Sequence, residues 1–297
     1  MKYVFIFNGR PDKAAVNNGI SAFLAESGHI ADCETYTTKS AGDATDFVRN
    51  HCRNHSDEDI CYVACGGDGT INEVISGMIG YPDKCFSVVA CGTGNDFVKY
   101  YSPGKFSSPD GVFNGRTSTI DVIKVNDGRY CVNVCNIGFE AAVCSIANRL
   151  SAEGHPDPYR KGIFKALLTG RFNRITIIAD NERLNAKRLL LCTLANSSYV
   201  GGGYCCAPRA KNDDGFMELC LVKPISLVRF ISMLPLYRKG RHLDSRRCLK
   251  VIKYRRVRHV EVHSKDMTEL CLDGEMMAGR DFTIEIVPAA LKLIVPE

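Results

Sequence analysis

The stretch A-C-G-G-D-G-T-I-N, residues 64–72, joins an apolar run at 60–63 to an amphipathic run that follows it. Glycines at the junction of a strand and a helix let main-chain N–H groups close around a phosphate. Asp68 puts a carboxylate in the middle of this loop, where it would repel an anionic ligand. The stretch therefore predicts a phosphate-binding loop, and it leaves the role of one acidic residue to be explained.

The residues after the loop predict a helix. Thr70 and Glu73 form the pattern T-x-x-E, which is typical of a capping box and places the helix start at Thr70. The N–H groups at that end, and the positive end of the helix dipole, would face the space left by the loop glycines, Gly66, Gly67 and Gly69. The loop is not a Walker A motif, and Asn72 stands where a dinucleotide fingerprint needs its third glycine.

A second glycine loop, C-G-T-G-N-D-F at 91–97, also follows a buried strand. Thr93 and Asp96 repeat the T-x-x-D spacing before what we expect to be another helix. Loops at the carboxyl ends of neighbouring parallel strands meet at one edge of the sheet. The two loops are therefore expected to converge on one site, the alternative being two unrelated tight turns.

The hydrophobic pattern divides the chain near residue 120. Up to that point strands and helices alternate, which predicts a parallel sheet with helices on both faces. Beyond it, short alternating runs and an Asp-Gly turn at 127–128 predict hairpins and an antiparallel β-sandwich, which two helices near 159–168 and 226–239 interrupt. We expect an α/β domain with a nucleotide site over 1–120 and a β-sandwich domain over 121–287. The active site would lie in the cleft between these domains.

Composition and charge narrow the class of protein. With 45% hydrophobic and 24% charged residues, the chain is typical of a globular protein, and no apolar run is long enough to span a bilayer. The start lacks a signal-peptide pattern, and the fifteen cysteines have no zinc-site spacing, so we expect reduced thiols in a cytoplasm. The segment 237–258 contains ten Lys and Arg and one Asp, which indicates a face that meets anions or, alternatively, a solvated surface.

The motifs resemble the diacylglycerol kinase catalytic-domain family, which includes bacterial lipid kinases and sphingosine and ceramide kinases. G-G-D-G-T-I-N-E and C-G-T-G-N-D-F are similar to its two glycine loops. Further blocks follow in the family's order, at 121–141 (D-V-I-K through G-F-E-A), 195–219 (A-N-S-S through F-M-E-L), 272–275 (L-D-G-E) and 288–296 (P-A-A-L-K-L-I-V-P). One departure is the first loop, Asn8-Gly9-Arg10-Pro11, where the family has N-P-x-x-G. Arg10 or Lys13 could supply positive charge there, or each could be simply solvated.

The resemblance implies that 1–120 binds ATP, that the closing strand 288–297 returns to that domain, and that 121–287 binds the lipid substrate and carries the catalytic base. It also implies roles for individual residues. Asp273, in Leu272-Asp273-Gly274-Glu275, matches the general base that takes the proton of a lipid hydroxyl. Taken alone, this D-G-E would be a hairpin turn. The positions that match the family's ATP contacts are Thr38, Gly66, Gly67, Asp68, Gly69, Thr70, Asn72, Glu73, Thr93 and Glu275.

The family also implies Mg²⁺ near D-D-G. The matching positions are Lys211, Asp214 and Phe216, of which the lysine and the phenylalanine could contribute only main-chain oxygens. Asp68 and Asp96 would join Asp214 and Asp273 in a carboxylate–water–magnesium network. The carboxylate in the phosphate loop is then expected to hold the metal or its water, or else to cap a turn.

The resemblance thus implies an ATP- and magnesium-dependent kinase for a lipid hydroxyl, with diacylglycerol as the first expectation. Other acceptors are phosphatidylglycerol, a sphingoid base or a prenyl alcohol, and other classes are a soluble NAD-kinase-like enzyme or a catalytically silent regulator. We expect the protein to touch the inner face of an anionic membrane transiently, with the basic segment contributing. Nucleic acid is not expected, because that segment has few interleaved aromatic residues. An edge strand of the second domain could pair two copies as a homodimer.

Overall fold

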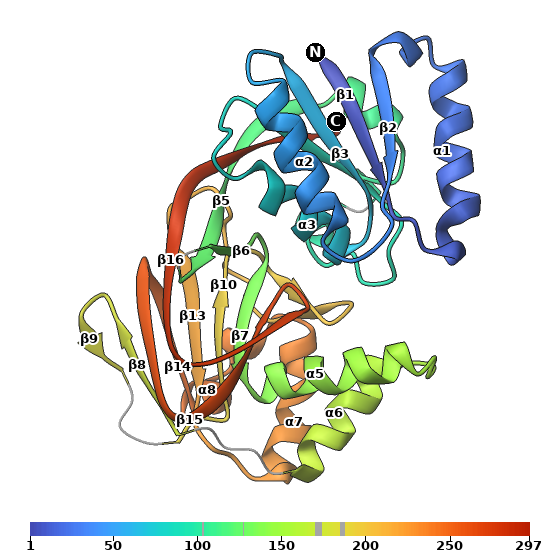
Figure 1. Ribbon diagram of the computed structural model, residues 1–297. Helices are drawn as coiled ribbons and strands as arrows, with labels where there is room; N and C mark the ends of the chain where they lie inside the picture. Colours follow the sequence, from blue (N-terminus) through green and yellow to red (C-terminus); the bar gives the residue numbers. More distant parts are fainter. Residues whose placement is uncertain (103, 127, 170–173, 185–187) are drawn as a thin grey trace. The chain divides into compact units, whose positions relative to one another are not determined.

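A computed structural model describes residues 1–102, 104–126, 128–169, 174–184 and 188–297 (Figure 1). The chain forms two compact units. The first contains Met1–Asp121 and Ala289–Glu297, and the second contains Val122–Pro288. Among the described helices, none is both long enough and apolar enough to cross a lipid bilayer.

The first unit is a parallel α/β layer. Its strands pair in the order β4–β3–β1–β2, and the end of β16 adds to β4, where Lys292 is in register with Cys85. The strands are β1 (Lys2–Phe7), β2 (Cys33–Thr37), β3 (Ile60–Gly66), β4 (Cys85–Ala90) and β16 (Glu275–Val295). The helices are α1 (Ala14–Glu26), α2 (Asp43–Asn54), α3 (Asp68–Met78) and the short α4 (Asp110–Phe113), with the 3₁₀ turns η1 (Pro11–Lys13), η2 (Ile30–Asp32) and η3 (Val98–Tyr100).

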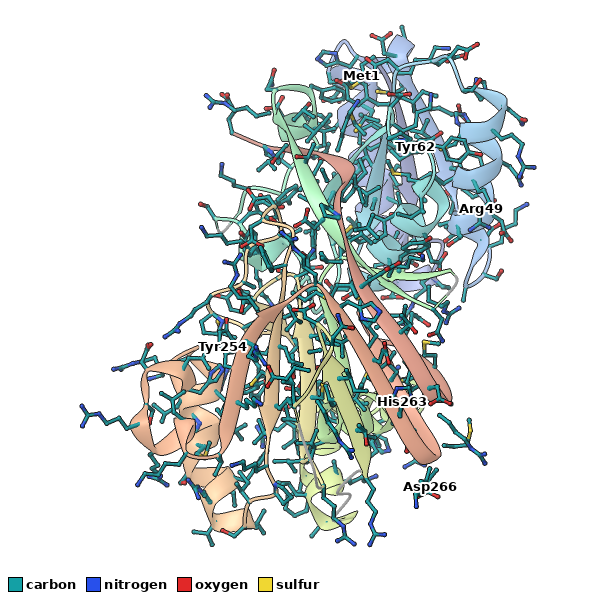
Figure 2. All side chains as sticks on the ribbon, turned by 90° about the vertical axis from the view of Figure 1, so that its left-hand side faces the viewer. Met1, Arg49, Tyr62, Tyr254, His263 and Asp266 are labelled. Carbon is teal, nitrogen blue, oxygen red and sulfur yellow. The ribbon has the colours of Figure 1, made fainter. Side chains whose placement is uncertain are left out.

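Helices cover both faces of this layer, with α1 on one side and α2 and α3 on the other (Figure 1). The strand β3 is buried along its whole length, as the continuous apolar run predicts for a central parallel strand. Tyr62 lies inside this unit, whereas Arg49 on α2 points outward (Figure 2). The central strands β3 and β4 therefore carry the two glycine loops out of a rigid, buried sheet.

The second unit is antiparallel, with strands in the order β14–β13–β10–β7–β15–β16. The first half of β15 pairs with β8 and its second half with β7, and its register with β16 shifts between His263 and Thr268. The strands are β5 (Arg116–Val125), β6 (Arg129–Cys131), β7 (Val134–Gly138), β8 (Ile175–Ala179), β9 (Glu182–Arg183), β10 (Leu191–Ala195), β11 (Tyr199–Val200), β12 (Tyr204–Cys205), β13 (Met217–Val222), β14 (Ile252–Val257) and β15 (His259–Leu272). The predicted fold class, α/β followed by a β-sandwich-like part, is confirmed.

The described part of the second unit contains four helices and one 3₁₀ turn. They are α5 (Phe139–Ala152), α6 (Pro158–Thr169), α7 (Leu227–Arg238), η4 (His242–Asp244) and α8 (Arg246–Leu249). The helices predicted near 159–168 and 226–239 are present as α6 and α7, whereas α5 was not predicted. The hairpin predicted around residue 127 is supported by the antiparallel pairing of β5 with β6, although Asp127 itself is outside the described residues. All fifteen cysteines are free and most are buried, as expected for thiols that pack in a core.

Candidate functional site

The two glycine loops lie against each other at the carboxyl ends of β3 and β4, as the sequence predicts. The Cys91 N–H donates to the Gly66 carbonyl at 3.0 Å. A side chain at Gly92 would place its Cβ 2.4 Å from the Gly67 Cα, so neither loop has room for one. Asn95, at φ 51°, closes the second loop by donating to the Gly92 carbonyl at 2.8 Å and accepting from the Gly92 N–H at 3.0 Å.

Asp68 fastens the first loop to the second. Its Oδ1 accepts from the Phe97 N–H at 3.1 Å, and a Cβ at Gly94 would be 2.8 Å from its Oδ2. Burial and the nearby charge of Asp96 raise the pKa of the Asp68 carboxyl. Asp96 is itself buried and accepts from the Lys99 Nζ at 3.1 Å. The structure therefore places two carboxylates together at the glycine loops, with the Lys99 ammonium beside Asp96.

The first loop of the chain joins the same site. The Asn8 Nδ2 donates to the Thr70 Oγ1 at 3.1 Å, and the Gly9 N–H donates to the Thr38 Oγ1 at 3.0 Å. A Cβ at Gly9 would be 1.8 Å from the Thr38 carbonyl oxygen, so this glycine is required for the approach. Thr38 and Thr70, which lie far apart in the sequence, are thus linked through residues 8 and 9.

The two basic residues of this loop differ in their surroundings. The Lys13 Nζ donates to the Cys91 carbonyl at 3.1 Å, which ties the start of α1 to the second glycine loop. Arg10 is exposed and pairs with Asp12 at 3.1 Å. Lys13 is therefore fixed beside the glycine loops, whereas Arg10 is a surface ion pair.

The predicted capping box is wrong. The helix α3 begins at Asp68, not Thr70, and no side chain caps it. Glu73 turns instead to the start of α2, where its Oε1 accepts from the Gly42 N–H at 2.9 Å and its Oε2 from the Ala44 N–H at 3.2 Å. The helix expected after Asp96 is also wrong, because only the 3₁₀ turn η3 forms there. Glu73 caps a neighbouring helix, and its pattern with Thr70 matched a motif by coincidence.

The remaining predicted ATP contacts in the first unit differ in exposure. Gly69 is exposed, and a Cβ built on it meets no atom within 4 Å. Thr93 is exposed in the second loop, while Asn72 is half-buried on α3. Packing within the protein requires glycine at 66, because a Cβ there would be 2.3 Å from the Thr70 Oγ1. No such contact requires glycine at 69, so the space beside its main chain is open to a ligand.

Asp273 occupies a two-residue hairpin between β15 and β16. Asp273 (φ 49°) and Gly274 (φ 99°) both adopt left-handed conformations, as a type I′ turn requires. The carboxylate accepts main-chain N–H groups of three successive residues, from Val132 and Val134 at 2.8 Å and from Asn133 at 3.3 Å. D-G-E is therefore a hairpin turn whose aspartate side chain is fixed against the segment between β6 and β7. Glu275, two residues on, is exposed.

The predicted magnesium positions lie in the loop before β13. Asp214 forms an ion pair with Arg256, and its Oδ1 accepts from the Phe216 N–H at 3.1 Å. The guanidinium groups of Arg256 and Arg258 lie 4.3 and 4.5 Å from the Phe216 ring centroid, and Lys211 is exposed. Over the described residues, no three His, Cys, Asp or Glu side chains are grouped as a metal site. Asp214 is therefore neutralised by an arginine in this structure.

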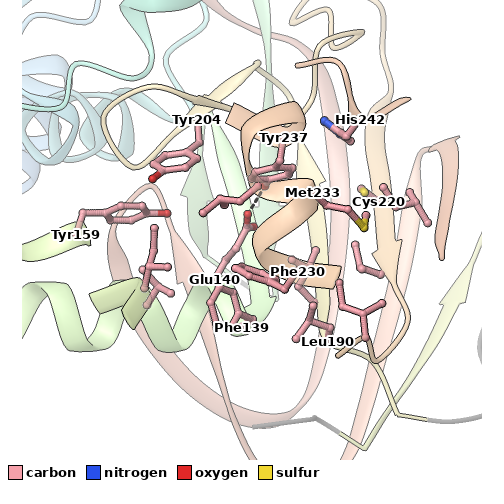
Figure 3. Close-up of a pocket in the computed structure, with 17 residues that line it drawn as sticks. Phe139, Glu140, Tyr159, Leu190, Tyr204, Cys220, Phe230, Met233, Tyr237 and His242 are labelled. Atoms are coloured by element: carbon pink, nitrogen blue, oxygen red, sulfur yellow. Dashed lines mark hydrogen bonds between the residues drawn. The ribbon is translucent and has the colours of Figure 1, made fainter. Parts of the chain in front are cut away.

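An apolar pocket in the second unit was not predicted. Helices α5, α6 and α7 and strands β10, β13 and β14 line it, and Figure 3 shows the polar groups that face it. Glu140, which is buried, accepts from the Thr193 hydroxyl at 2.8 Å and from the Tyr237 hydroxyl. Burial raises the pKa of both the Glu140 carboxyl and the Tyr237 hydroxyl. The only sequence signal for this site was a glutamate in the otherwise apolar run G-F-E-A-A-V.

Both parts of the chain match described domains of one enzyme class. Residues 2–125 match the diacylglycerol kinase catalytic domain, and residues 133–295 match the YegS C-terminal NAD kinase beta sandwich-like domain. Over 251 residues the chain is 30% identical to the diacylglycerol kinase of Bacillus subtilis (strain 168), covering 82% of this chain and 79% of the relative. Over 262 residues it is 26% identical to a probable lipid kinase YegS-like of Pectobacterium atrosepticum, covering 86% and 83%. The chain therefore belongs to the diacylglycerol kinase family of lipid kinases.

Solved structures share the fold. A putative diacylglycerol kinase from Bacillus anthracis str. Sterne has a TM-score of 0.77 at 20% identity, over 99% of this chain and 96% of that one. An NAD kinase from Archaeoglobus fulgidus in complex with ATP has a TM-score of 0.53 at 12% identity, over 100% and 94%. At these identities the likeness concerns architecture alone.

Proposed function

We propose that this lipid kinase transfers the γ-phosphoryl group of ATP to the primary hydroxyl of a membrane lipid, with diacylglycerol as the first candidate and phosphatidic acid as its product. The observation that carries the proposal is the match of residues 2–125 to the diacylglycerol kinase catalytic domain. The second unit adds a mostly apolar pocket of about 60 Å³, which has room for only a few methylene groups of an acyl chain. Each methylene group that left water there would contribute about 0.8 kcal/mol.

ATP would be held by the converging glycine loops of the first unit. Main-chain N–H groups at the start of α3 and the positive end of its dipole favour phosphate oxygens. The open position at Gly69 lets the main chain approach them closely. Thr38, Thr70 and Thr93 would provide hydroxyls. Glu73 would act indirectly, by holding the start of α2 in place.

Asp68 and Asp96 fit the binding of a divalent cation that accompanies ATP. They offer hard oxygen donors, and the nearby charge of Asp96 already raises the pKa of the Asp68 carboxyl. A bound Mg²⁺ would supply positive charge against the phosphate groups. The alternative set, Asp214 with main-chain oxygens of Lys211 and Phe216, would need Asp214 to exchange its ion pair with Arg256 for the metal.

Asp273 is the proposed general base. Its carboxylate would take the proton of the lipid hydroxyl as that oxygen bonds to the γ-phosphorus and the bond to ADP breaks. Three main-chain N–H groups fix the carboxylate, so it would need no reorientation when the substrate arrives. Glu275 begins the strand that follows and is proposed to face the nucleotide side of the same turn.

The proposed place of action is the cytoplasmic face of a membrane that contains anionic lipid. Fifteen free thiols suit a reducing compartment. The lipid substrates themselves reside in a bilayer, so the enzyme would bind it transiently. The basic segment 237–258 would favour anionic lipid by roughly 1 kcal/mol for each Lys or Arg near the surface.

Transfer of labelled phosphate from ATP to a panel of acceptors tests the proposal. The panel contains dispersed diacylglycerol, phosphatidylglycerol, a sphingoid base, a prenyl alcohol and NAD, with products separated by chromatography. Diacylglycerol should be the best acceptor, and Asp273→Asn should lower the rate by about 10²–10⁴. ATP affinity and thermal unfolding of the variant, measured in parallel, separate lost chemistry from a damaged turn. Labelling of NAD alone, or near-normal transfer by Asp273→Asn, would contradict the proposal.

A further inference from the structure

The helix α7 is apolar on two opposite sides. At about 100° per residue, Phe230, Met233 and Tyr237 fall on one arc and face the apolar pocket. Leu227, Val228 and Ile231 fall on another arc, with 51%, 79% and 56% of their surface exposed. Apolar side chains of a surface helix normally face the core, so this outer arc is unusual in being open among the residues that the structure describes.

The end of α8 also exposes an apolar side chain. Leu249 is 47% exposed. Single exposed apolar residues are ordinary on a protein surface, and only their grouping carries information. Four of the ten large apolar side chains that are exposed in the described part of the chain lie on these two helices.

Four cations border the same area. Arg229, Arg246, Arg247 and Lys250 line a surface hollow with Ser226 and Val228. The Arg229 guanidinium donates to the Arg247 carbonyl at 3.0 Å, and the Arg247 guanidinium donates to the Ser232 hydroxyl. Among the residues that the structure describes, none of the four forms an ion pair with a carboxylate. Like charges so close together are stabilised by an anionic partner.

We propose that the α7–α8 surface, meaning Leu227, Val228, Ile231 and Leu249 with the four cations, docks on an anionic bilayer. Its apolar side chains would enter the interface, and its cations would meet lipid phosphates. Because α7 also forms a wall of the apolar pocket, docking there would bring that pocket to the leaflet that holds the lipid. This use of the surface rests on the proposed function, whereas bilayer binding itself does not.

The chain contains no tryptophan, so a single one can report on insertion. In Ile231→Trp, vesicles of equimolar phosphatidylglycerol and phosphatidylcholine should shift the emission to the blue, and brominated lipid should quench it. Ile30→Trp is the matched control, because Ile30 is 54% exposed in the first unit and should show neither effect. Equal quenching at both positions, or none at Ile231→Trp, would overturn the proposal.

Co-sedimentation with the same vesicles measures affinity. Val228→Ser combined with Ile231→Ser should weaken binding at least tenfold. Arg246→Gln and Lys250→Gln should each weaken it about fivefold at low salt, the equivalent of 1 kcal/mol per cation. Ile30→Ser and Arg53→Gln, exposed residues of the first unit, should leave it unchanged. Unchanged binding in the α7–α8 variants would overturn the proposal.

Two further measurements distinguish the docking surface from the proposed catalytic function and from a dimer interface. Phosphate transfer to detergent-dispersed lipid should be retained by the α7–α8 variants, and vesicle binding should persist in Asp273→Asn. A chain that binds vesicles through α7 and α8 yet phosphorylates no lipid would contradict the proposed function while supporting the docking surface. A dimer that dissociates in Val228→Ser/Ile231→Ser, with vesicle binding unchanged, would assign the surface to a second copy and overturn the proposal.

Discussion

Replacing Glu73 by glutamine should destabilise the first unit without greatly affecting ATP binding. Its two oxygens accept the N–H groups of Gly42 and Ala44 at the start of α2. Glutamine keeps one acceptor but turns an NH₂ toward the other N–H, so one bond of about 1 kcal/mol is lost. Loss of the charge at a helix N-terminus removes about 0.5 kcal/mol more. The expected total is about 1.5 kcal/mol.

Thermal unfolding checks this value. For a chain of this size, about 1.5 kcal/mol corresponds to a fall in Tm of roughly 3–6 °C. Glu26→Gln is the matched control, because Glu26 is exposed at the end of α1 and none of the described residues bonds to its carboxylate. Its Tm should be unchanged or slightly higher. ATP affinity, measured by calorimetric titration, should change less than twofold in both variants. An unchanged Tm in Glu73→Gln together with much weaker ATP binding would refute the capping role.

Three other perturbations test the site and the pocket. Gly69→Ala and Gly19→Ala each replace an open helical glycine and should each stabilise the chain by about 0.5–1 kcal/mol, but only Gly69→Ala should weaken ATP binding, about tenfold or more by titration. The raised pKa of Asp68 means that its contribution to stability is present at low pH and is lost as pH rises through that pKa. Asp68→Asn should therefore raise Tm near neutral pH while weakening magnesium activation and turnover. Burial lowers the pKa of His242 to about 4, so stability should fall by up to about 3 kcal/mol between pH 6.5 and 4, and His242→Gln should remove that part of the pH dependence of unfolding.

The fold class could be predicted because its signals are local. Continuous apolar runs followed by glycine loops identify buried parallel strands, and alternating runs with turn residues identify antiparallel ones. The helix α5 was not predicted, because every residue of its first turn, Phe139–Ala142, is buried, including its one polar residue, Glu140. Periodicity identifies amphipathic helices, and a helix enclosed between a sheet and another helix loses that signal.

The candidate site could be predicted only in part. The meeting of the two glycine loops was predicted correctly, because each loop is a motif of residues that are adjacent in the sequence. The partner of Glu73 could not be found, because Gly42 and Ala44 lie about thirty residues away in the sequence and only packing brings α2 beside it. The pocket around Glu140 was missed for the same reason, since its lining comes from separate stretches of chain between Phe139 and Ile252. Sequence patterns describe neighbours along the chain, whereas a pocket is made of neighbours in space.

The position of Asp68 explains why the first glycine loop has a hydrogen-bond acceptor there, but it does not explain why that acceptor is charged. The second loop needs an acceptor for the Phe97 N–H, and Asp68 provides it from the first turn of α3. An asparagine oxygen could accept the same bond without the electrostatic penalty that burial and Asp96 impose on a carboxylate. The charge is therefore not explained by the fold alone, since the fold would be more stable without it. A divalent cation brought by the nucleotide would relieve that penalty, so magnesium and ATP together should stabilise the first unit more than ATP alone, and the difference should shrink in Asp68→Asn.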